Sequence, residues 1–469
     1  MNRKKILPFL GVALAVALSF ALQMRSSDWD SDWNRDNSAQ PLKLLGTIAI
    51  PGKPIASTDI AWVDQTTGRF FFSDRSNASV DVVDARHDLY LAKIATNGTA
   101  ATVASTTVAS SAEGTVHFTG LTSPSTHEGP NGVVSTSDKL VWADDGDSTS
   151  KLLDLDPASP NYLQIIAVVN TVPLAGAGPG GTTLPACTGG ATGSCNRADE
   201  MAYDADDGII VAANDEPTSV PPYLTFFSTQ APYPILGQMN FLAQGDGVGG
   251  SLEQPVWDPQ IHRFLQTLPP LNEIAVIKAG GNPFKMTVER TISLPRSCTG
   301  EALAPDGHLV LACGTPLVID VATGEEIGPG ITEVGGGDEV NYDPGDNRFV
   351  VSSNVDASSS NPQVLGVINA ANGQWLQNLP PATPAPSGGT MGTGGLETNG
   401  RSGNLAAFGG NNHVFVVVHP AAPPATDICG FFTPPPVAPA TVGTPVDFGC
   451  VAVFGPTGKP RSDNGGFGR

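Results

Sequence analysis

Apolar and polar residues alternate in short runs along most of the chain, and Gly, Asn, Asp or Pro residues separate the runs. The clearest example is residues 337–352, where two alternating runs flank a Pro-Gly-Asp-Asn turn. Two such runs around this kind of turn are typical of a β-hairpin. An acidic pair, Asp338 and Glu339, comes directly before the first run.

The same arrangement recurs along the chain and defines seven units. In the first unit four strands follow one another, over residues 58–64, 68–74, 79–84 and 89–94. The other units begin near residues 130, 199, 253, 300, 338 and 403. A repeated meander of short strands without long helical runs is typical of propeller blades. The sequence therefore predicts an all-β, seven-bladed β-propeller, with six or eight blades as the alternatives because the units differ in length.

Residues 42–50 (Leu-Lys-Leu-Leu-Gly-Thr-Ile-Ala-Ile) form a predicted strand that belongs to no unit. The seventh unit, in contrast, lacks a convincing fourth strand. Pairing the two would close the ring and remove the open sheet edges. We therefore expect the propeller to span residues 41–456, with strand 42–50 joining the last blade.

The ends of the chain have a different composition. A basic start, an apolar run over residues 6–22 and small residues near position 21 predict a signal peptide over residues 1–21. An uncleaved N-terminal anchor is the alternative, although the run is short for a membrane span. Residues 22–40 are predicted to be a flexible acidic lead-in, and residues 457–469 a disordered tail. These features predict a secreted or periplasmic protein without stable membrane insertion after cleavage.

The formal net charge is −21, with only 24 Lys and Arg residues. Such a surface repels phosphate backbones, so nucleic acid is not an expected partner, whereas cations such as calcium are. Solubility alone is the other explanation of this charge. Long loops over residues 97–125, 171–194 and 380–395 favour a small-molecule ligand or a protein partner at the loop face. We expect a monomer.

Six cysteines suit an oxidising compartment, and they lie in three close pairs along the chain. Sequence does not fix their connectivity. The spacing favours disulfides between neighbours, namely Cys187 with Cys195, Cys298 with Cys313, and Cys429 with Cys450.

Polar residues stand directly before the first strand of each unit, at the positions that should face the central channel of a propeller. The predicted set is Asp59, Asn131, Glu200, Gln254, Glu301, Glu339 and Asn404, with Asp199, Glu253 and Asp338 one position earlier. Carboxylate and amide oxygens are the ligands that calcium prefers. We predict a divalent-cation site formed by Asp59, Asn131, Glu200, Glu301 and Glu339. Satisfying backbone groups or solvating the channel is the alternative role.

Residues 127–133 (His-Glu-Gly-Pro-Asn-Gly-Val) resemble the Glu-Gly-Pro and Pro-Asn-Gly motifs of SMP-30/gluconolactonase-like propellers. The Asp-Gly turns and residues 318–320 (Val-Ile-Asp) resemble YVTN-type repeats. The lactonase resemblance implies one divalent cation, held by Glu, Asn and Asp side chains, that polarises a lactone carbonyl and activates water. Glu128 and Asn131 match these motifs, which lie in one unit here and in different blades in the family.

Two functions follow from these observations. The first is a calcium-assisted hydrolase or lactonase at the channel mouth, with Glu128 as general base and His127 sharing that role. A lone loop histidine is, however, more often a surface residue. The second is a non-catalytic propeller that binds a ligand, a glycan or a protein. Convergence of the acidic side chains on one point would favour the hydrolase, whereas a symmetric, dispersed ring would favour a scaffold or binding role.

Overall fold

The structure is a computed structural model of the 469-residue chain. It describes residues 41–96, 116–122, 127–173, 176–177, 183–184, 196–215, 220–241, 251–356, 364–379, 404–419, 429 and 449–456. The chain divides into two units, residues 1–40 and 41–469, and every described residue belongs to the second. The predicted signal peptide, lead-in and tail lie outside the described residues and stay predictions.

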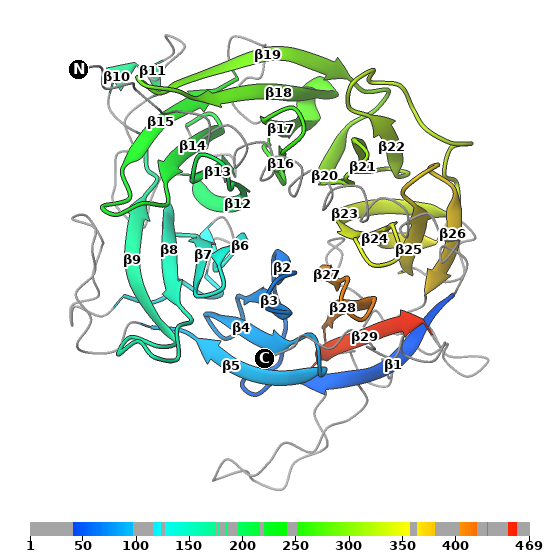
Figure 1. The fold of residues 1–469 in the computed structure, drawn as a ribbon, viewed down its shortest axis with the longest axis horizontal. Helices are drawn as coiled ribbons and strands as arrows, with labels where there is room; N and C mark the ends of the chain where they lie inside the picture. The colour runs from blue at the N-terminus through cyan, green and yellow to red at the C-terminus, as the bar shows by residue number, and fades with distance from the viewer. Residues whose placement is uncertain are drawn as a thin grey trace, which may run out of the picture. The chain divides into compact units, whose positions relative to one another are not determined.

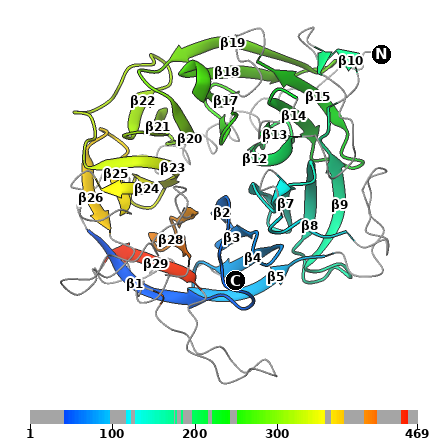
Figure 2. The same cartoon turned by 180° about the vertical axis from the view of Figure 1, so that it is seen from behind.

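Six sheets of four strands and one of three surround a common axis within the described part of residues 41–469 (Figure 1, Figure 2). Each innermost strand contacts the innermost strand of the next sheet, and the seventh contacts the first. This arrangement confirms the predicted all-β, seven-bladed β-propeller. The described residues also form a two-stranded sheet outside the blades and a short 3₁₀ helix, Pro269–Leu271, between two paired strands of one blade.

The strands of each blade run from the axis outward in the following order. Blade 1 contains β2 (Ala61–Asp64), β3 (Arg69–Asp74), β4 (Ser79–Asp84) and β5 (Leu89–Ile94). Blade 2 contains β6 (Val133–Ser137), β7 (Leu140–Asp145), β8 (Thr149–Asp154) and β9 (Gln164–Asn170). Blade 3 contains β12 (Arg197–Asp204), β13 (Ile209–Asp215), β14 (Tyr223–Ser228) and β15 (Ile235–Asn240). Strands β10 (Gly176–Ala177) and β11 (Thr183–Leu184) form the small extra sheet.

The remaining blades follow the same order. Blade 4 contains β16 (Val256–Asp258), β17 (Arg263–Leu268), β18 (Glu273–Gly280) and β19 (Lys285–Ser293). Blade 5 has three strands, β20 (Cys298–Leu303), β21 (His308–Cys313) and β22 (Leu317–Asp320). Blade 6 contains β23 (Val334–Asp343), β24 (Arg348–Asp356), β25 (Val364–Asn369) and β26 (Trp375–Leu379). Blade 7 contains β27 (Leu405–Phe408), β28 (His413–Val418), β29 (Cys450–Pro456) and β1 (Leu42–Ala49).

The turn after the innermost strand has the same construction in several blades. An aspartate ends the strand, and its Oδ1 accepts hydrogen bonds from backbone N–H groups of the turn. Asp64, Asp204 and Asp258 do this with donors two residues ahead, at 2.8, 2.9 and 2.8 Å. An Asp side chain in this role stabilises a tight turn between neighbouring strands. These turns lie at the end of the blades opposite the start of the innermost strands.

Apolar side chains fill the spaces between adjacent blades, and aromatic rings meet at several of these junctions. The rings of Phe70 and Phe415 stack between blades 1 and 7, with centroids 5.3 Å apart. Trp142 contacts Phe227 of the next blade edge to face at 5.1 Å. Burial of large apolar side chains at each junction supplies the main stabilising free energy. The core is therefore a series of layers between blades, and the axis itself remains lined by polar residues.

Strand β1 closes the ring as predicted. It pairs antiparallel with β29, from Leu42 opposite Pro456 to Ala49 opposite Cys450. The last sheet therefore combines one strand from the start of the propeller with three from its end. This pairing covers the edge of β29 that would otherwise be open.

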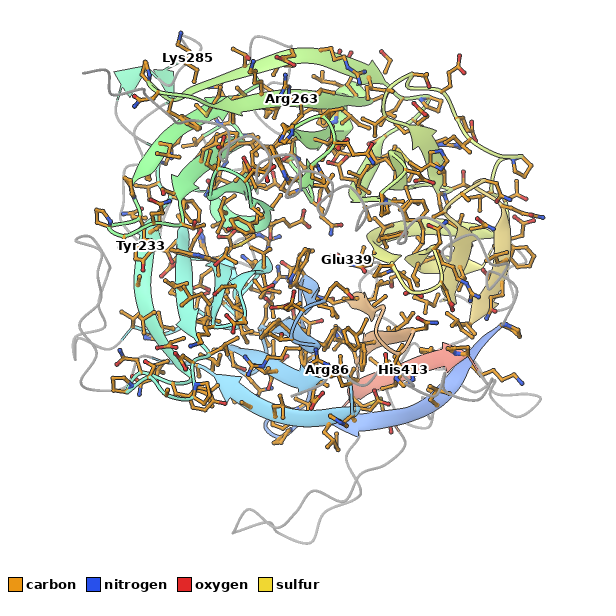
Figure 3. All side chains as sticks on the ribbon, in the orientation of Figure 1. Arg86, Tyr233, Arg263, Lys285, Glu339 and His413 are labelled. Carbon is orange, nitrogen blue, oxygen red and sulfur yellow. A yellow bond between two sulfur atoms is a disulfide. The ribbon has the colours of Figure 1, made fainter. Side chains whose placement is uncertain are left out.

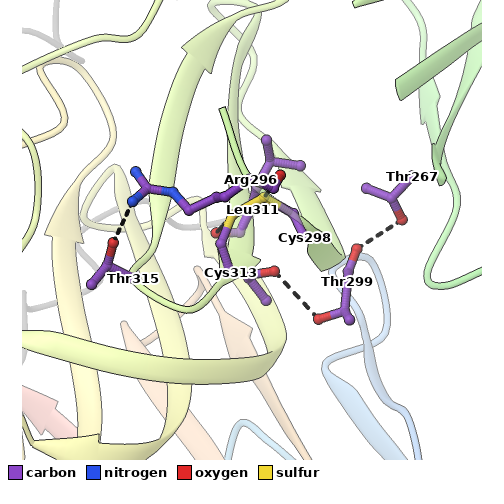
Figure 4. Close-up of a disulfide and its surroundings, with 8 residues drawn as sticks. Thr267, Arg296, Cys298, Thr299, Leu311, Cys313 and Thr315 are labelled. Atoms are coloured by element: carbon purple, nitrogen blue, oxygen red, sulfur yellow. Dashed lines mark hydrogen bonds between the residues drawn. A yellow bond between two sulfur atoms is a disulfide. The ribbon is translucent and has the colours of Figure 1, made fainter. Parts of the chain in front are cut away.

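Two of the three predicted disulfides lie within the described residues and are confirmed. Cys298 pairs with Cys313 across the hairpin of β20 and β21, with Cα atoms 4.1 Å apart (Figure 4). Cys429 pairs with Cys450 at the start of β29. Cys187 and Cys195 lie outside the described residues. The two disulfides are compatible with an extracellular protein.

Membrane-spanning helices were sought in the same described ranges. No helix there has the length and apolar character that crossing a bilayer requires.

Candidate ligand site at the ring axis

Strand direction places the longest connections at one end of the blades. The first strand of a blade begins at this end, the second ends there, and the third begins there. The blade strands that precede residues 97–115, 185–195, 380–403 and 430–448 end here, and the blade strands that follow these residues begin here. We call it the axial end. Loops on a rigid β scaffold are common places for binding residues, so the axial end is where the site should be sought.

A β-bulge interrupts the pairing of the first two strands at the axial end. In blade 3, Asp199 and Glu200 together face Ala213, because Ala198 pairs with Asn214 and Met201 with Ala212. We call the two residues of such a pair the first and second bulge residues. A bulge changes the direction in which the side chains of the strand point.

The same bulge occurs around the ring. In blade 6, pairing passes from Gly337 with Ser353 to Val340 with Val351, which leaves Asp338 and Glu339 in the bulge. In blades 1, 2 and 7 the backbone hydrogen bonds of Asp59, Asn131 and Asn404 give the same geometry. In blades 1 and 3 the first bulge residue lies five residues before the aspartate of the turn, Asp64 or Asp204. The turn aspartate of blade 4 is Asp258, so the same spacing assigns Glu253 and Gln254 to the two bulge positions.

The residues predicted from the sequence therefore occupy three structural positions rather than the two that were expected. Asp59, Asn131, Asp199, Glu253 and Asp338 are first bulge residues. Glu200, Gln254, Glu339 and Asn404 are second bulge residues. Glu301 is neither, because the bulge of blade 5 consists of Thr299 and Gly300.

The first bulge residues of blades 1 to 3 are joined by Arg75, which follows β3. Its guanidinium contacts the Asp59 carboxylate, and its Nε donates to Asn131 Oδ1 at 3.0 Å. Its Nη2 lies 3.8 Å from Asp199 Oδ1. The backbone carbonyl of Arg75 accepts from the Leu121 N–H at 2.9 Å, which fixes the turn. Arg75 therefore balances charge and connects three blades from a buried position.

Further contacts complete this network. Asn131 Nδ2 donates to the Ala198 carbonyl at 2.7 Å, across the junction of blades 2 and 3. Arg197 Nη2 donates to Asp199 Oδ2 at 2.8 Å. Pairing offsets part of the desolvation free energy that burial of these charged groups costs. The first bulge residues of these blades thus have partners within the protein.

His419 and Thr58 hold Asn404 in place. Thr58 Oγ1 donates to Asn404 Oδ1 at 3.1 Å and lies 2.9 Å from His419 Nε2. Burial, together with the positive charge of Arg75, lowers the pKa of His419 to about 4. The imidazole is therefore neutral near pH 7, and its Nε2–H donates to the threonine hydroxyl. Asn404 Oδ1 is engaged, whereas its Nδ2 is buried without a hydrogen-bond partner.

Glu200 and Gln254, like Asn404, have buried polar atoms without a hydrogen-bond partner. Glu200 is only 7% exposed, and its Oε2 has no hydrogen-bond partner. Gln254 Oε1 is likewise buried and unpartnered. Leaving such atoms unsatisfied costs about 1–3 kcal/mol each. Glu339, another second bulge residue, lies at the inner side of the ring (Figure 3).

The pKa of Glu200 is affected by carboxyl groups from several blades. Burial raises the pKa of Glu200 well above its usual value, and the charges of Glu253, Glu339, Asp199 and Asp59 raise it further. These neighbours belong to blades 1, 3, 4 and 6. Because strongly perturbed carboxyl groups are frequent at sites of function, Glu200 is a candidate functional residue.

Glu301 lies apart from this group. It follows the blade 5 bulge, at the position that Ala61, Val133, Met201 and Val340 occupy in other blades. Its side chain is fully buried, and neither carboxyl oxygen has a hydrogen-bond partner. Burial alone raises the pKa of Glu301 well above its usual value. Glu301 therefore occupies a position of the core between blades, away from other charges.

The five side chains predicted to hold calcium differ in their surroundings. Asp59 and Asn131 contact Arg75, whereas burial alone raises the pKa of Glu301. Across the described ranges, no three or more His, Cys, Asp or Glu side chains are grouped so as to hold a metal ion. The divalent-cation site formed by these five residues stays a prediction.

Glu128 and His127 lie on the segment that leads to Asn131. Both are partly exposed, and their backbone packs so closely on Gly146 that a Cβ there would lie 2.0 Å from the His127 carbonyl. Among the described contacts, neither side chain forms a hydrogen bond or an ion pair. Their predicted catalytic roles stay predictions.

Sequence reasoning missed Arg75, Arg197, Thr58 and His419. Arg75 and His419 follow the second strands of blades 1 and 7, so only closure of the ring brings them near each other. The aspartates that end the innermost strands are the sequence feature that would have located the bulge residues. Counting five residues back from Asp64, Asp204, Asp258 and Asp343 gives the first bulge residues directly.

Fold and site together define a seven-bladed β-propeller with a polar, partly unsatisfied axis. No family model matches the chain, and no curated protein matches it in sequence. Among solved structures, it is similar to the β-propeller domain of Myceliophteria thermophila Cps50 (Swd1). The two share 9% identity with a TM-score of 0.48, over 89% of this chain and 100% of that one. The likeness to SMP-30/gluconolactonase-like and YVTN-repeat proteins stays a prediction.

Proposed function

We propose that the protein is an exported, ligand-binding β-propeller that takes a small, positively charged ligand at the axial end. The second bulge residues Glu200, Gln254 and Glu339 would hold its charged group. The observation that carries this proposal is Glu200 Oε2, a buried carboxyl oxygen without a hydrogen-bond partner among the charges of four other carboxyl groups.

A positive group beside Glu200 would remove two costs together. It would give the unpartnered oxygen a donor, and it would offset the repulsion among neighbouring carboxylates. The cation would also oppose the rise that burial and the neighbouring charges cause in the pKa of Glu200, so binding would favour the ionised carboxylate. Hydrogen bonds between charged partners are roughly twice as strong as neutral ones. Arg75 does not fill this role, because it contacts Asp59 and Asn131.

Binding is favoured over hydrolysis by the same geometry. The unsatisfied atoms at the axis are acceptors and a donor held in place by packing, as a recognition site requires. The described contacts connect neither Glu128 nor His127 with this group. Export is supported by the two disulfides and by the N-terminal sequence, which matches a secretory signal.

Calorimetric titration with two separate probes, ethylammonium chloride and calcium chloride, tests the proposal. We expect at least one probe to bind the wild-type protein, with affinity reduced roughly tenfold or more in Glu200→Gln. Glu325→Gln is the matched control, since Glu325 is exposed and remote in sequence from the bulges. Binding of calcium alone would identify the cation as a metal ion, and binding of ethylammonium alone would identify it as an organic amine.

Two results would overturn the proposal. One is the absence of binding by either probe to folded wild-type protein. The other is equal affinity of wild type and Glu200→Gln, because the charged group would then lie elsewhere. Thermal unfolding of each variant verifies that it is folded before the titration.

A further inference from the structure

The disulfide between Cys298 and Cys313 links two strands that already pair with each other. The two cysteines lie directly opposite on β20 and β21, and their Cα atoms are 4.1 Å apart (Figure 4). Disulfides usually join Cα atoms about 4.4–6.8 Å apart, and a departure from the preferred geometry makes the bond easier to reduce. The pairing of β20 with β21 therefore holds these cysteines closer together than disulfides usually hold their Cα atoms.

The other described disulfide provides an internal comparison. The Cα atoms of Cys429 and Cys450 are 5.6 Å apart, within the usual range. In the sheet Cys450 lies opposite Val418 and Ala49, so Cys429 is not its partner in strand pairing. Relaxed structural disulfides resist reduction, whereas strained ones are reduced more readily. Of these two disulfides, we therefore expect the one in blade 5 to be reduced first.

Blade 5 has fewer strands than its neighbours. Within the described residues it has three, whereas the other six blades have four. Beyond β22, an isolated bridge between Ile319 and Glu326 stands in place of a fourth strand. Parts of a protein with fewer paired strands open locally at a lower free energy. Because Cys298 and Cys313 are only 1% and 4% exposed, a small thiol reaches their sulfur atoms through such an opening.

The disulfide also lies at the axial end of blade 5, directly before the bulge. Thr299, the first bulge residue, follows Cys298, and its carbonyl accepts from Thr267 Oγ1 of blade 4 at 2.8 Å. Just beyond the disulfide, Arg296 Nη1 donates to Thr315 Oγ1 at 2.8 Å (Figure 4). Reduction would leave this end of β20 and β21 joined by hydrogen bonds without a covalent link. The bulge and its contact with blade 4 would then be held less firmly.

We propose that the disulfide between Cys298 and Cys313 is a redox-sensitive switch, which a small thiol opens while the disulfide between Cys429 and Cys450 stays intact. Two thiol molecules supply two electrons and two protons, the S–S bond breaks, and two cysteine thiol groups form. The two small thiols are oxidised to their own disulfide in the same reaction. Opening of the switch loosens the axial end of blade 5. This inference is independent of the proposed cation binding.

A redox titration with glutathione tests the order of reduction. The folded full-length protein is equilibrated near neutral pH with mixtures of glutathione and glutathione disulfide, starting from the oxidised and from the reduced protein until both give the same result. Free thiols are trapped with N-ethylmaleimide and located by peptide mass spectrometry. We expect half reduction of Cys298–Cys313 at a ratio of squared glutathione to glutathione disulfide concentration roughly tenfold lower than for Cys429–Cys450, which corresponds to about 30 mV.

Hydrogen exchange measured by mass spectrometry tests the loosening. In a mixture that reduces Cys298–Cys313 alone, we expect the amides of residues 298–313 to exchange roughly tenfold faster than in the oxidised protein. The amides of residues 61–94, in blade 1, are the control and should exchange at an unchanged rate. A double variant, Cys298→Ala with Cys313→Ala, should show the fast exchange without any thiol. If this variant does not fold, the comparison of oxidised and reduced wild type still decides.

Three results would overturn the inference. One is reduction of Cys429–Cys450 at the same ratio as Cys298–Cys313 or at a lower one. Another is a Cys298–Cys313 disulfide that glutathione leaves intact at every ratio in the folded protein. The third is unchanged exchange of residues 298–313 after reduction, because the disulfide would then have no effect on the axial end of blade 5.

Discussion

Glu301 illustrates the cost of placing a carboxyl group at a core position. Four other blades have Ala, Val or Met there, and these side chains pack between blades without polar atoms to satisfy. The carboxyl oxygens of Glu301 have no hydrogen-bond partner, and the group is fully buried. A buried, ionised carboxylate is strongly unfavourable, so the group takes up a proton instead.

The pH dependence of stability tests this reading of Glu301. Because burial raises its pKa above the unfolded value, the stability from protonation is complete below the unfolded pKa and is lost as the pH rises through the folded pKa. We expect the free energy of unfolding of wild type to fall between pH 5 and pH 8 by about 1 kcal/mol or more relative to Glu301→Gln. Urea denaturation at both pH values measures the difference, and Glu325→Gln should behave like wild type.

Arg75 is the residue whose removal should most disturb the axial end. Arg75→Met leaves Asp59 buried without its cationic partner, so we expect a loss of about 3–5 kcal/mol of unfolding free energy. Adding Asp59→Asn should recover part of it. Arg263→Met is the control, since Arg263 pairs with Glu289 at an exposed position, where a loss of about 1 kcal/mol or less is expected. Equal losses of unfolding free energy in Arg75→Met and Arg263→Met, measured by chemical denaturation, would show that the Arg75 network stabilises the protein no more than an exposed ion pair does.

At the level of elements, the sequence predicted the strands, the hairpins and the closing strand because each leaves a local pattern. Alternation predicts a strand, and an orphan strand beside an incomplete unit predicts closure. The register of the repeats was not predicted, because the bulge adds a residue to the start of the innermost strand. Glu301 was therefore aligned with Glu200, although it lies one position further along.

Closure by β1 has a direct mutational test within one strand. Ile48 is buried between blades 7 and 1, whereas Leu44 on the same strand is 43% exposed. We expect Ile48→Ala to lower the free energy of unfolding by about 2–4 kcal/mol and Leu44→Ala by about 0.5 kcal/mol or less. Urea unfolding of both variants measures this. Similar effects of the two substitutions would contradict the packing of β1 described above.

At the level of the whole propeller, ring closure creates the site. Arg75 and His419 lie 344 residues apart in sequence, by subtraction of their numbers, and both influence the surroundings of the bulge residues. No local pattern reveals such a pair, which explains why the carboxyl groups were predicted and their basic partners were not. The first bulge residues of blades 1 to 3 have partners within the protein, whereas Glu200, Gln254 and Asn404 each keep a buried polar atom without a hydrogen-bond partner.

A crystal structure of the protein grown with ethylammonium chloride or calcium chloride, whichever binds in solution, tests the central claim most directly. We expect the ammonium nitrogen about 3 Å from Glu200 Oε2, or a calcium ion about 2.4 Å from this oxygen. The same crystals of Glu200→Gln should show no cation at this place. Ordered water alone beside Glu200, at a cation concentration that saturates the protein in solution, would contradict a cation site at the ring axis.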